Sequence, residues 1–125
     1  MNREIKFRGK DILHKSWQYG SLAKDEPQKS YYIIDNEYGR GIDVDKETVG
    51  PYTGLHDKNG KEIYEGDILK SIQWNDIYLV KYIGTAFYLC RKGNNGFNKI
   101  TTWNNAVKSE IIGNIYDNSE LLGGE

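Results

Sequence analysis

Apolar and polar residues alternate over short runs along most of the chain, and turn-forming residues separate these runs. Alternation with a period of two is typical of half-buried β-strands. In the first half of the chain this pattern predicts strands at residues 5–8, 16–22 and 30–35, and the polar residues 24–29 read as a surface loop. Residues 43–48 alternate charge with little apolar content, which indicates an edge strand or a loop.

The second half of the chain carries sharper turn signals. The tetrapeptide 57–60, Asp-Lys-Asn-Gly, predicts a tight turn, because Asn and Gly both tolerate positive φ. It should join a strand that ends near His56 to one that begins near Lys61. Further strands are expected at 68–74, 77–83, 86–92 and 111–116, with a loop at 93–96 and one helical turn at 104–108. Short strands in meander order favour a small barrel of the SH3 type.

Composition supports the same fold class. The chain holds ten Tyr and 14 Gly but a single Met, a balance that suits pleated sheets and turns better than helices. A length of 125 residues allows one domain, or one domain made of two small lobes. We therefore predict an all-β fold with an N-terminal β lobe over 1–50 and a C-terminal SH3-like barrel over 51–125, packed as one compact unit.

The segment 77–83 has apolar side chains on both of its faces. Tyr78, Val80 and Tyr82 fall on one face, and the other face is also largely apolar, with Leu79 at its centre. Only one face of a small barrel points inward, so the second face must contact either the N-terminal half or another subunit. Packing within the chain is favoured, and a homo-oligomer is compatible with it.

Several classes of protein are excluded by the sequence pattern. No run approaches the roughly 18 apolar residues that a membrane-spanning helix needs, so no membrane association is expected. The basic N-terminus lacks the apolar core of a secretory signal. Cys90 is the single cysteine, which rules out an internal disulfide and indicates a reducing compartment.

Enzyme motifs and metal-ligand spacings are missing from the sequence. His14 and His56 are isolated, Cys90 has no paired histidine, and there is no phosphate-binding loop or dinucleotide fingerprint. We therefore expect no catalytic residue, no metal and no cofactor.

One acidic cluster offers an alternative, a small metal-dependent hydrolase or nuclease. The cluster comprises Glu62, Glu65 and Asp67, near Asp57, and such carboxylates can hold a divalent cation. The favoured interpretation is a charged hairpin edge on which Asp67 accepts hydrogen bonds from turn amides.

Charge is unevenly distributed although the net charge is −1. Residues 68–108 hold six Lys or Arg against Asp76 alone, whereas 1–67 carry a net charge of −2 and 109–125 a net charge of −4. Trp74 and Trp103 are interleaved with the cations of this basic segment. Aromatic platforms among cations are typical of sheets that bind single-stranded nucleic acid. The candidate nucleic-acid contacts are Lys81, Arg91, Lys92, Lys99, Trp74 and Trp103.

Two other interpretations of the same residues stay open. The aromatic side chains can be core residues while the lysines solubilise the outer face, and the near-neutral whole chain favours this view. An aromatic groove of an SH3-like barrel can also hold a peptide. The acidic tail with Leu121 and Leu122 either docks on a neighbouring barrel or frays.

Two long segments resemble a known family. YTGLHDKNGKEIYEGDIL at 52–69 and EIIGNIYDNSELL at 110–122 are similar to the YopX family of phage and prophage proteins, and so are REIKFRGKD at 3–11 and YGSL at 19–22. Residues 23–46 are the main variable part. The resemblance implies a phage or prophage gene product in the host bacterial cytoplasm, a mostly β fold with an SH3-like C-terminal part, and self-association. It supplies no catalytic residues, so a non-enzymatic binding or accessory protein is expected.

Overall fold

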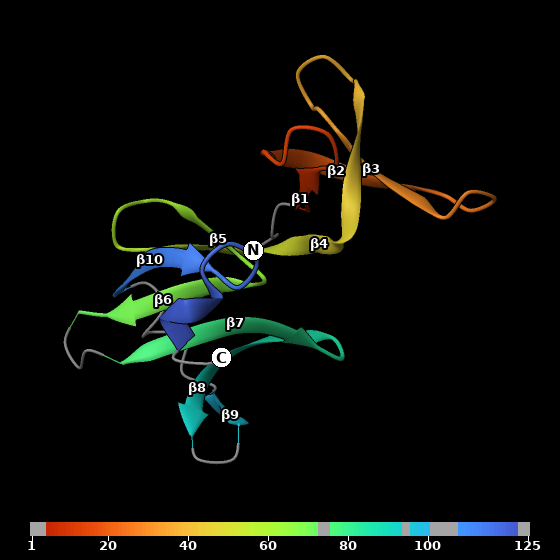
Figure 1. Cartoon of the computed structure of the whole chain (residues 1–125). Coiled ribbons are helices and arrows are strands. Elements are labelled where there is room, and N and C mark those ends of the chain that lie inside the picture. Colours follow the sequence, from red (N-terminus) through yellow and green to blue (C-terminus); the bar gives the residue numbers. More distant parts are fainter. Residues whose placement is uncertain (1–4, 73–75, 94–95, 101–107, 123–125) are drawn as a thin grey trace. The chain divides into compact units, whose positions relative to one another are not determined.

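The fold is all-β, as the sequence predicts. A computed structural model describes residues 5–72, 76–93, 96–100 and 108–122, and of residues 92–100 only the backbone (Figure 1). The strands are β1 Phe7–Asp11, β2 Trp17–Asp25, β3 Ser30–Ile34, β4 Gly41–His56, β5 Glu62–Tyr64, β6 Asp67–Ser71, β7 Ile77–Ile83, β8 Ala86–Gly93, β9 Gly96–Ile100 and β10 Ser109–Asn114, followed by a 3₁₀ helix, η1, over Ser119–Leu122. In this described part of the chain, no helix has the length and apolar character needed to cross a membrane.

The chain divides into two compact units, Met1–Tyr52 and Thr53–Glu125. The sequence-based prediction placed this division between residues 50 and 51. β4 contributes residues to both units, so the division falls inside a strand and not in a loop.

The N-terminal unit is a ring of four antiparallel strands. β1 pairs with β2, β2 with β3, β3 with β4, and β4 with β1. Val44 lies at the closure, because it is opposite Tyr31 of β3 on one side and Asp11 of β1 on the other. Ile33 and Val44 are buried in this unit. A ring leaves fewer unpaired strand edges than an open sheet does.

Residues 43–48 correct one sequence-based expectation. They lie inside β4, which pairs here with β3 through Asp43 and Val44 and with β1 through Val44 and Asp45, while residues 46–48 lie in a break of the β1–β4 ladder. The charged Asp43 and Asp45 face solvent, whereas Val44 and Thr48 are buried. The charged residues therefore mark the outer face of a strand, and Val44 is the apolar residue that marks its inner face.

Gly20 is the point at which β2 changes partner. Residues 17–20 pair with β1, and residues 21–25 pair with β3. A Cβ atom on Gly20 would lie 2.0 Å from the backbone oxygen of Ile34, and the residue has a φ of 157°. The ring can close at this position because glycine has no side chain.

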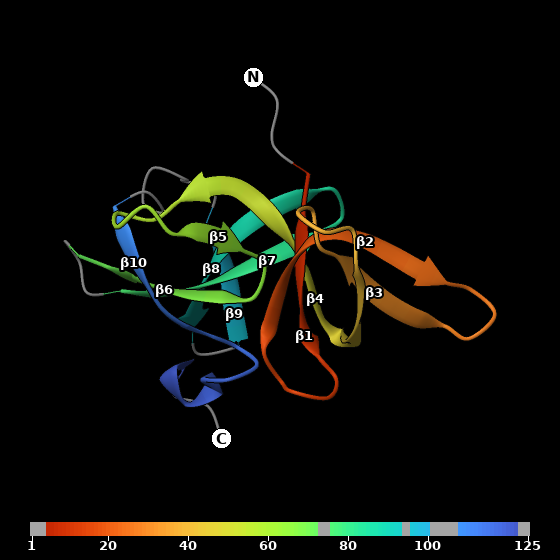
Figure 2. The same ribbon diagram turned by 90° about the horizontal axis from the view of Figure 1, so that it is seen from above.

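The C-terminal unit contains a five-stranded antiparallel sheet in the order β10-β6-β7-β8-β9 (Figure 2). Its core combines β5, the central strands and the end of β4. The buried cluster consists of Ile63, Leu69, Tyr78, Val80 and Leu89, with Leu55, Phe87 and Ile111 packed against it. The core therefore consists of apolar side chains from β5, β6, β7 and β8.

The turn between β4 and β5 is the one predicted from Asp-Lys-Asn-Gly. The Asp57 N–H donates to the Lys61 carbonyl at 2.8 Å, and the Gly60 N–H donates to the Asp57 carbonyl at 3.0 Å. Gly60 has a φ of 85°, the left-handed conformation that glycine adopts without steric cost.

β7 is buried on both faces at its centre. Tyr78 and Val80 belong to the core cluster, and Leu79 on the opposite face is also only 2% exposed. Leu79 lies opposite Ile68 and Cys90, which are buried as well. The second apolar face is therefore covered within the chain at Leu79, whereas Ile83 near the end of β7 is 40% exposed.

We expect Gly20→Ala to destabilise the protein by about 2 kcal/mol or more, because the new methyl group would lie 2.0 Å from the backbone oxygen of Ile34 and would force the β2–β3 pairing apart. Urea denaturation followed by circular dichroism measures this change in the free energy of unfolding.

Gly39→Ala is the matched control. Gly39 also has positive φ, at 71°, but no atom lies within 4 Å of the position that an added Cβ atom would take. Its cost should be limited to backbone strain, on the order of 1 kcal/mol. Equal losses for the two variants would contradict the role of Gly20 in closing the ring.

Candidate functional site

Asp57 belongs to the predicted acidic cluster, and its carboxylate is fully engaged in the fold. Oδ1 accepts hydrogen bonds from the backbone N–H groups of Asn59 and Lys61, both at 2.9 Å. Oδ2 accepts from the N–H of Ile111 at 3.0 Å, 54 residues along the chain. The side chain thus closes its own turn and fastens that turn to β10.

These contacts set the protonation of Asp57. Burial by itself raises the pKa of the carboxyl group, but the three N–H donors and the nearby Lys61 outweigh it and hold the pKa below its usual value. The side chain is 5% exposed. Asp57 is therefore a charged residue that stabilises the turn.

Asp67 and Glu62 of the same cluster also support local structure. The Asp67 carboxylate accepts a hydrogen bond from the N–H of Tyr64 at 2.7 Å, and Asp67 is only 2% exposed. The hydroxyl of Tyr64 donates to Glu62 at 2.9 Å. Within the described ranges no group of three or more His, Cys, Asp or Glu side chains is arranged to hold a metal ion. The contacts of Asp57 and Asp67 match the turn interpretation of this cluster.

His14 lies in the β1–β2 turn beside Asp11. Its Nδ1 is 3.2 Å from Oδ2 of Asp11, and Oδ1 of Asp11 accepts from the N–H of Leu13 at 2.8 Å. The hydrogen bond from His14 is the largest cause of a lowered pKa at Asp11. His14 therefore has a carboxylate neighbour, although its place in the sequence suggested an isolated residue.

The candidate nucleic-acid contacts fall on three neighbouring strands at one side of the C-terminal sheet. Lys81 is on β7, Arg91 and Lys92 are on β8, and Lys99 is on β9. Lys99 is opposite Cys90 in the β8–β9 ladder, and Lys92 is opposite Phe97. Trp74 and Trp103 lie outside the described residues.

Lys81 and Arg91 lie on opposite faces of this sheet. Arg91 is paired with Tyr78, and Lys81, three residues beyond Tyr78 on the same strand, is paired with Tyr88. The Arg91 guanidinium is 3.5 Å from the carboxylate of Asp76 and remains 55% exposed. The two cations were grouped on one surface from the sequence, but the register separates them.

Cation–aromatic contacts occur in the N-terminal unit, where no site was predicted from the sequence. The guanidinium of Arg8 lies 4.5 Å from the ring centre of Trp17, and Lys10 Nζ lies 5.7 Å from the same ring. Lys24 Nζ lies 5.4 Å from the ring of Tyr31. The pairing on Trp17 follows from the register, since Lys10 is directly opposite Trp17. Counting residues with a period of two on either side of the turn over residues 12–16 would have placed Lys10 opposite Trp17.

Comparison with known proteins identifies the family. The YopX protein family model matches residues 6–123, which is nearly the whole chain. The chain belongs to the YopX family. None of the curated proteins matches it. Its fold is similar to that of the protein EF1440 from Enterococcus faecalis, known from a crystal structure, with a TM-score of 0.59 and 24% identity over 97% of this chain and 99% of that one.

The two long segments that carry the YopX resemblance contain side chains that hydrogen-bond to the backbone. In the first segment, Asp57 accepts from three backbone N–H groups. In the second, Oδ1 of Asn114 accepts from the N–H groups of Tyr116 and Asp117, both at 3.0 Å, and Oδ1 of Asn118 accepts from the N–H of Asn114 at 3.2 Å. The YopX segments therefore specify the C-terminal frame.

We expect Asp57→Asn to destabilise this YopX-family protein by about 1–3 kcal/mol. The side-chain NH₂ group of Asn would take the place of one carboxylate oxygen, so at least one backbone N–H that donates to Asp57 would face another donor. The free energy of unfolding from urea denaturation at pH 7 is the measurement. Asp35→Asn is the control, since the carboxylate of Asp35 accepts from the N–H groups of Glu37 and Tyr38 in its own turn, a role that the Asn side-chain oxygen can fill.

The pH dependence gives a second readout of Asp57. Because the folded-state pKa of Asp57 is lowered, its contribution is present above the unfolded pKa of about 3.9 and is lost as the pH falls through the folded value. The stability difference between the wild type and Asp57→Asn should therefore shrink on acidification. A difference that stays constant from neutral pH to acid would contradict the charged role.

Proposed function

We propose that this YopX-family protein is a non-enzymatic, self-associating binding protein of phage or prophage origin that acts in the host bacterial cytoplasm. It contacts single-stranded nucleic acid with one side of its C-terminal, SH3-like unit. The observation that carries the proposal is the placement of Lys81, Arg91, Lys92 and Lys99 on the adjacent strands β7, β8 and β9. Residues 76–100, which contain these strands, hold these four cations and a single acidic residue, Asp76.

The positions of Lys81 and Arg91 favour a single strand over a duplex. The two cations lie on opposite faces of the sheet, so a rigid duplex docked on one face can contact only one of them. A flexible single strand can pass around the side of a sheet and present phosphates to both faces. Arg91 is exposed although it is near Asp76, which leaves its guanidinium accessible to a phosphate.

We expect fluorescence anisotropy to show binding of labelled single-stranded DNA or RNA that weakens log-linearly with salt, and weaker binding of duplex DNA. Arg91→Gln and Lys81→Gln should each reduce the salt slope by about 0.7, the value for one phosphate contact on a single strand.

Lys58→Gln is the control for this experiment. Lys58 is an exposed lysine in the β4–β5 turn of the same unit, so its replacement removes the same charge at a different place. Absence of binding at low salt would overturn the nucleic-acid proposal, and so would an equal loss of slope in all three variants.

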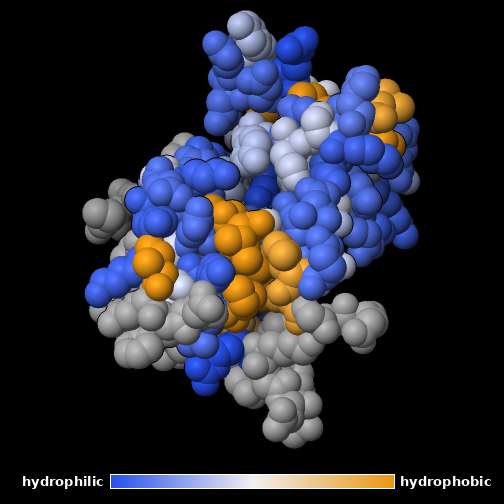
Figure 3. Space-filling model, turned by 60° about the vertical axis from the view of Figure 1, so that its left-hand side comes forward, coloured by the Kyte–Doolittle hydropathy of each residue, from blue (hydrophilic) through white to orange (hydrophobic). Residues whose placement is uncertain are grey.

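Self-association is supported by apolar side chains that remain exposed. Tyr82 and Ile83 at the end of β7 are 42% and 40% exposed, and the Tyr82 ring lies 4.6 Å from that of Phe87. Figure 3 shows that apolar side chains also reach one face of an otherwise largely hydrophilic surface. Contiguous exposed apolar residues often mark protein–protein contacts.

We expect the wild-type protein to form oligomers in analytical ultracentrifugation. Ile83→Lys should shift it toward monomer, because burying an unpaired charge in the contact between subunits costs free energy. Ile72→Lys is the control, since Ile72 is 57% exposed elsewhere in the same unit. A wild-type protein that stays monomeric at high concentration would contradict this part of the proposal.

A further inference from the structure

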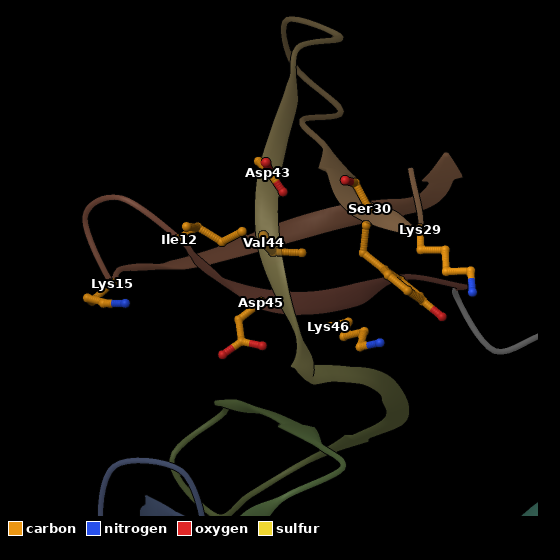
Figure 4. A pocket seen from close by; sticks show the side chains of 9 residues that line it. Ile12, Lys15, Lys29, Ser30, Asp43, Val44, Asp45 and Lys46 are labelled. Atoms are coloured by element: carbon orange, nitrogen blue, oxygen red, sulfur yellow. The ribbon is translucent and has the colours of Figure 1, made fainter. Parts of the chain in front are cut away.

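The N-terminal unit contains a pocket of about 380 Å³ (Figure 4). Two of its lining residues, Lys15 and Lys29, belong to the β1–β2 and β2–β3 turns and have positive φ, at 61° and 55°. They lie on opposite sides of β4, and the lining residues Asp43 and Asp45 fall on the face of β4 opposite to the buried Val44. These side chains therefore do not converge on one ligand.

Three polar side chains of the C-terminal unit do converge. Tyr78 of β7 is directly opposite Arg91 of β8, and Asp76 precedes Tyr78 by two residues. Directly paired residues share a face of a sheet, and so do residues two apart on an extended chain. In agreement with this register, the Arg91 guanidinium is 3.5 Å from the carboxylate of Asp76.

The carboxylate of Asp76 is held in place from the core. The hydroxyl of Tyr78, a residue that is only 2% exposed, donates a hydrogen bond to it. Burial raises the pKa of Tyr78 and the negative charge of Asp76 raises it further, so the hydroxyl stays a donor. The N–H of Ser71 donates to the Asp76 carbonyl at 2.8 Å, which ties the backbone of Asp76 to β6. Asp76 is therefore fixed beside Arg91.

Asp76 occupies the guanidinium in the way that a phosphate would. Carboxylates and phosphates both accept charge-assisted hydrogen bonds from arginine. Asp76 is also the single acidic residue in 76–100, so it is the one negative charge of this basic segment. A phosphate that binds Arg91 must displace the carboxylate or lie beside its negative charge, and both lower the affinity.

Release of Arg91 does not leave Asp76 without a partner. The Tyr78 hydroxyl remains as its donor, and the Asp76 side chain is 34% exposed to water. The exchange of carboxylate for phosphate therefore costs little more than one exposed ion pair, an interaction that contributes little in water. Such a competition is weak and reversible.

We propose that Asp76 is a built-in competitor for the phosphate at Arg91. It holds the guanidinium in the free protein and yields it to a phosphate of the bound strand, so it limits the affinity of the site. This role rests on the nucleic-acid contact proposed above and describes its regulation.

The test is fluorescence anisotropy of the full chain with a labelled single-stranded oligonucleotide at one low salt concentration. Asp76→Asn removes the charge but keeps an oxygen that accepts from the Tyr78 hydroxyl. It should bind about two- to fivefold more tightly than the wild type, the range expected for the loss of one exposed ion pair. Glu110→Gln is the matched control. It removes an exposed carboxylate on β10, at the opposite edge of the sheet from β9, and should change the affinity less.

A double variant assigns the gain to Arg91. Arg91→Gln should cost about two- to fivefold more affinity in the Asp76→Asn background than in the wild type, because Asp76 no longer neutralises the guanidinium. A general charge effect would make the two losses equal.

The outcomes separate this inference from the proposed function. Suppose that the wild type binds and depends on Arg91. Unchanged or weaker binding by Asp76→Asn, an equal gain in Glu110→Gln, or equal losses in the double-variant comparison then overturns the role of Asp76 and leaves the nucleic-acid contact standing. Absence of binding by both the wild type and Asp76→Asn at low salt overturns both.

Discussion

The C-terminal unit depends on one buried carboxylate. Asp57 accepts three backbone N–H groups, two from its own turn and one from Ile111 on β10. The Lys58 N–H adds a bond to the carbonyl of Ser109 beside it. The β4–β5 hairpin and the strand β10, which are far apart in the sequence, are thereby fixed to each other. The core cluster, which draws on β5 and has Ile111 packed against it, forms between elements that Asp57 holds in register.

The N-terminal unit reaches closure by different means. It has no comparable carboxylate bridge among its described residues, and its ring is completed where Val44 pairs on both sides and where Gly20 lets β2 change partners. Cations pack on aromatic rings of the same unit, with Arg8 on Trp17 and Lys24 on Tyr31. Such pairs bury the stems of charged residues against apolar surface while their charged ends stay near water.

Local features of the fold could be predicted from the sequence, and distant pairings could not. The turn at Asp57–Gly60 followed from Asn and Gly, and the strand 77–83 was placed correctly as β7 from its alternation. The sequence left residues 43–48 open between an edge strand and a loop, because Val44 is the single buried apolar residue that marks them as a paired strand. No local pattern shows that Val44 pairs with two strands, since this depends on contacts between residues distant in sequence. The candidate sites show the same limit, because only the β7–β8 register shows that Lys81 and Arg91 lie on opposite faces.

The hydrogen-bonded YopX segments have a consequence for how such proteins diversify. Residues 52–69 and 110–122 supply the frame, whereas the turns that hold Lys15 and Lys29 lie outside both segments. A scaffold divided in this way can exchange the residues of these two turns without loss of the hydrogen bonds that hold the two segments. Proteins with this frame can then share an architecture while differing in specificity, and these two turns are sites for grafting new recognition loops.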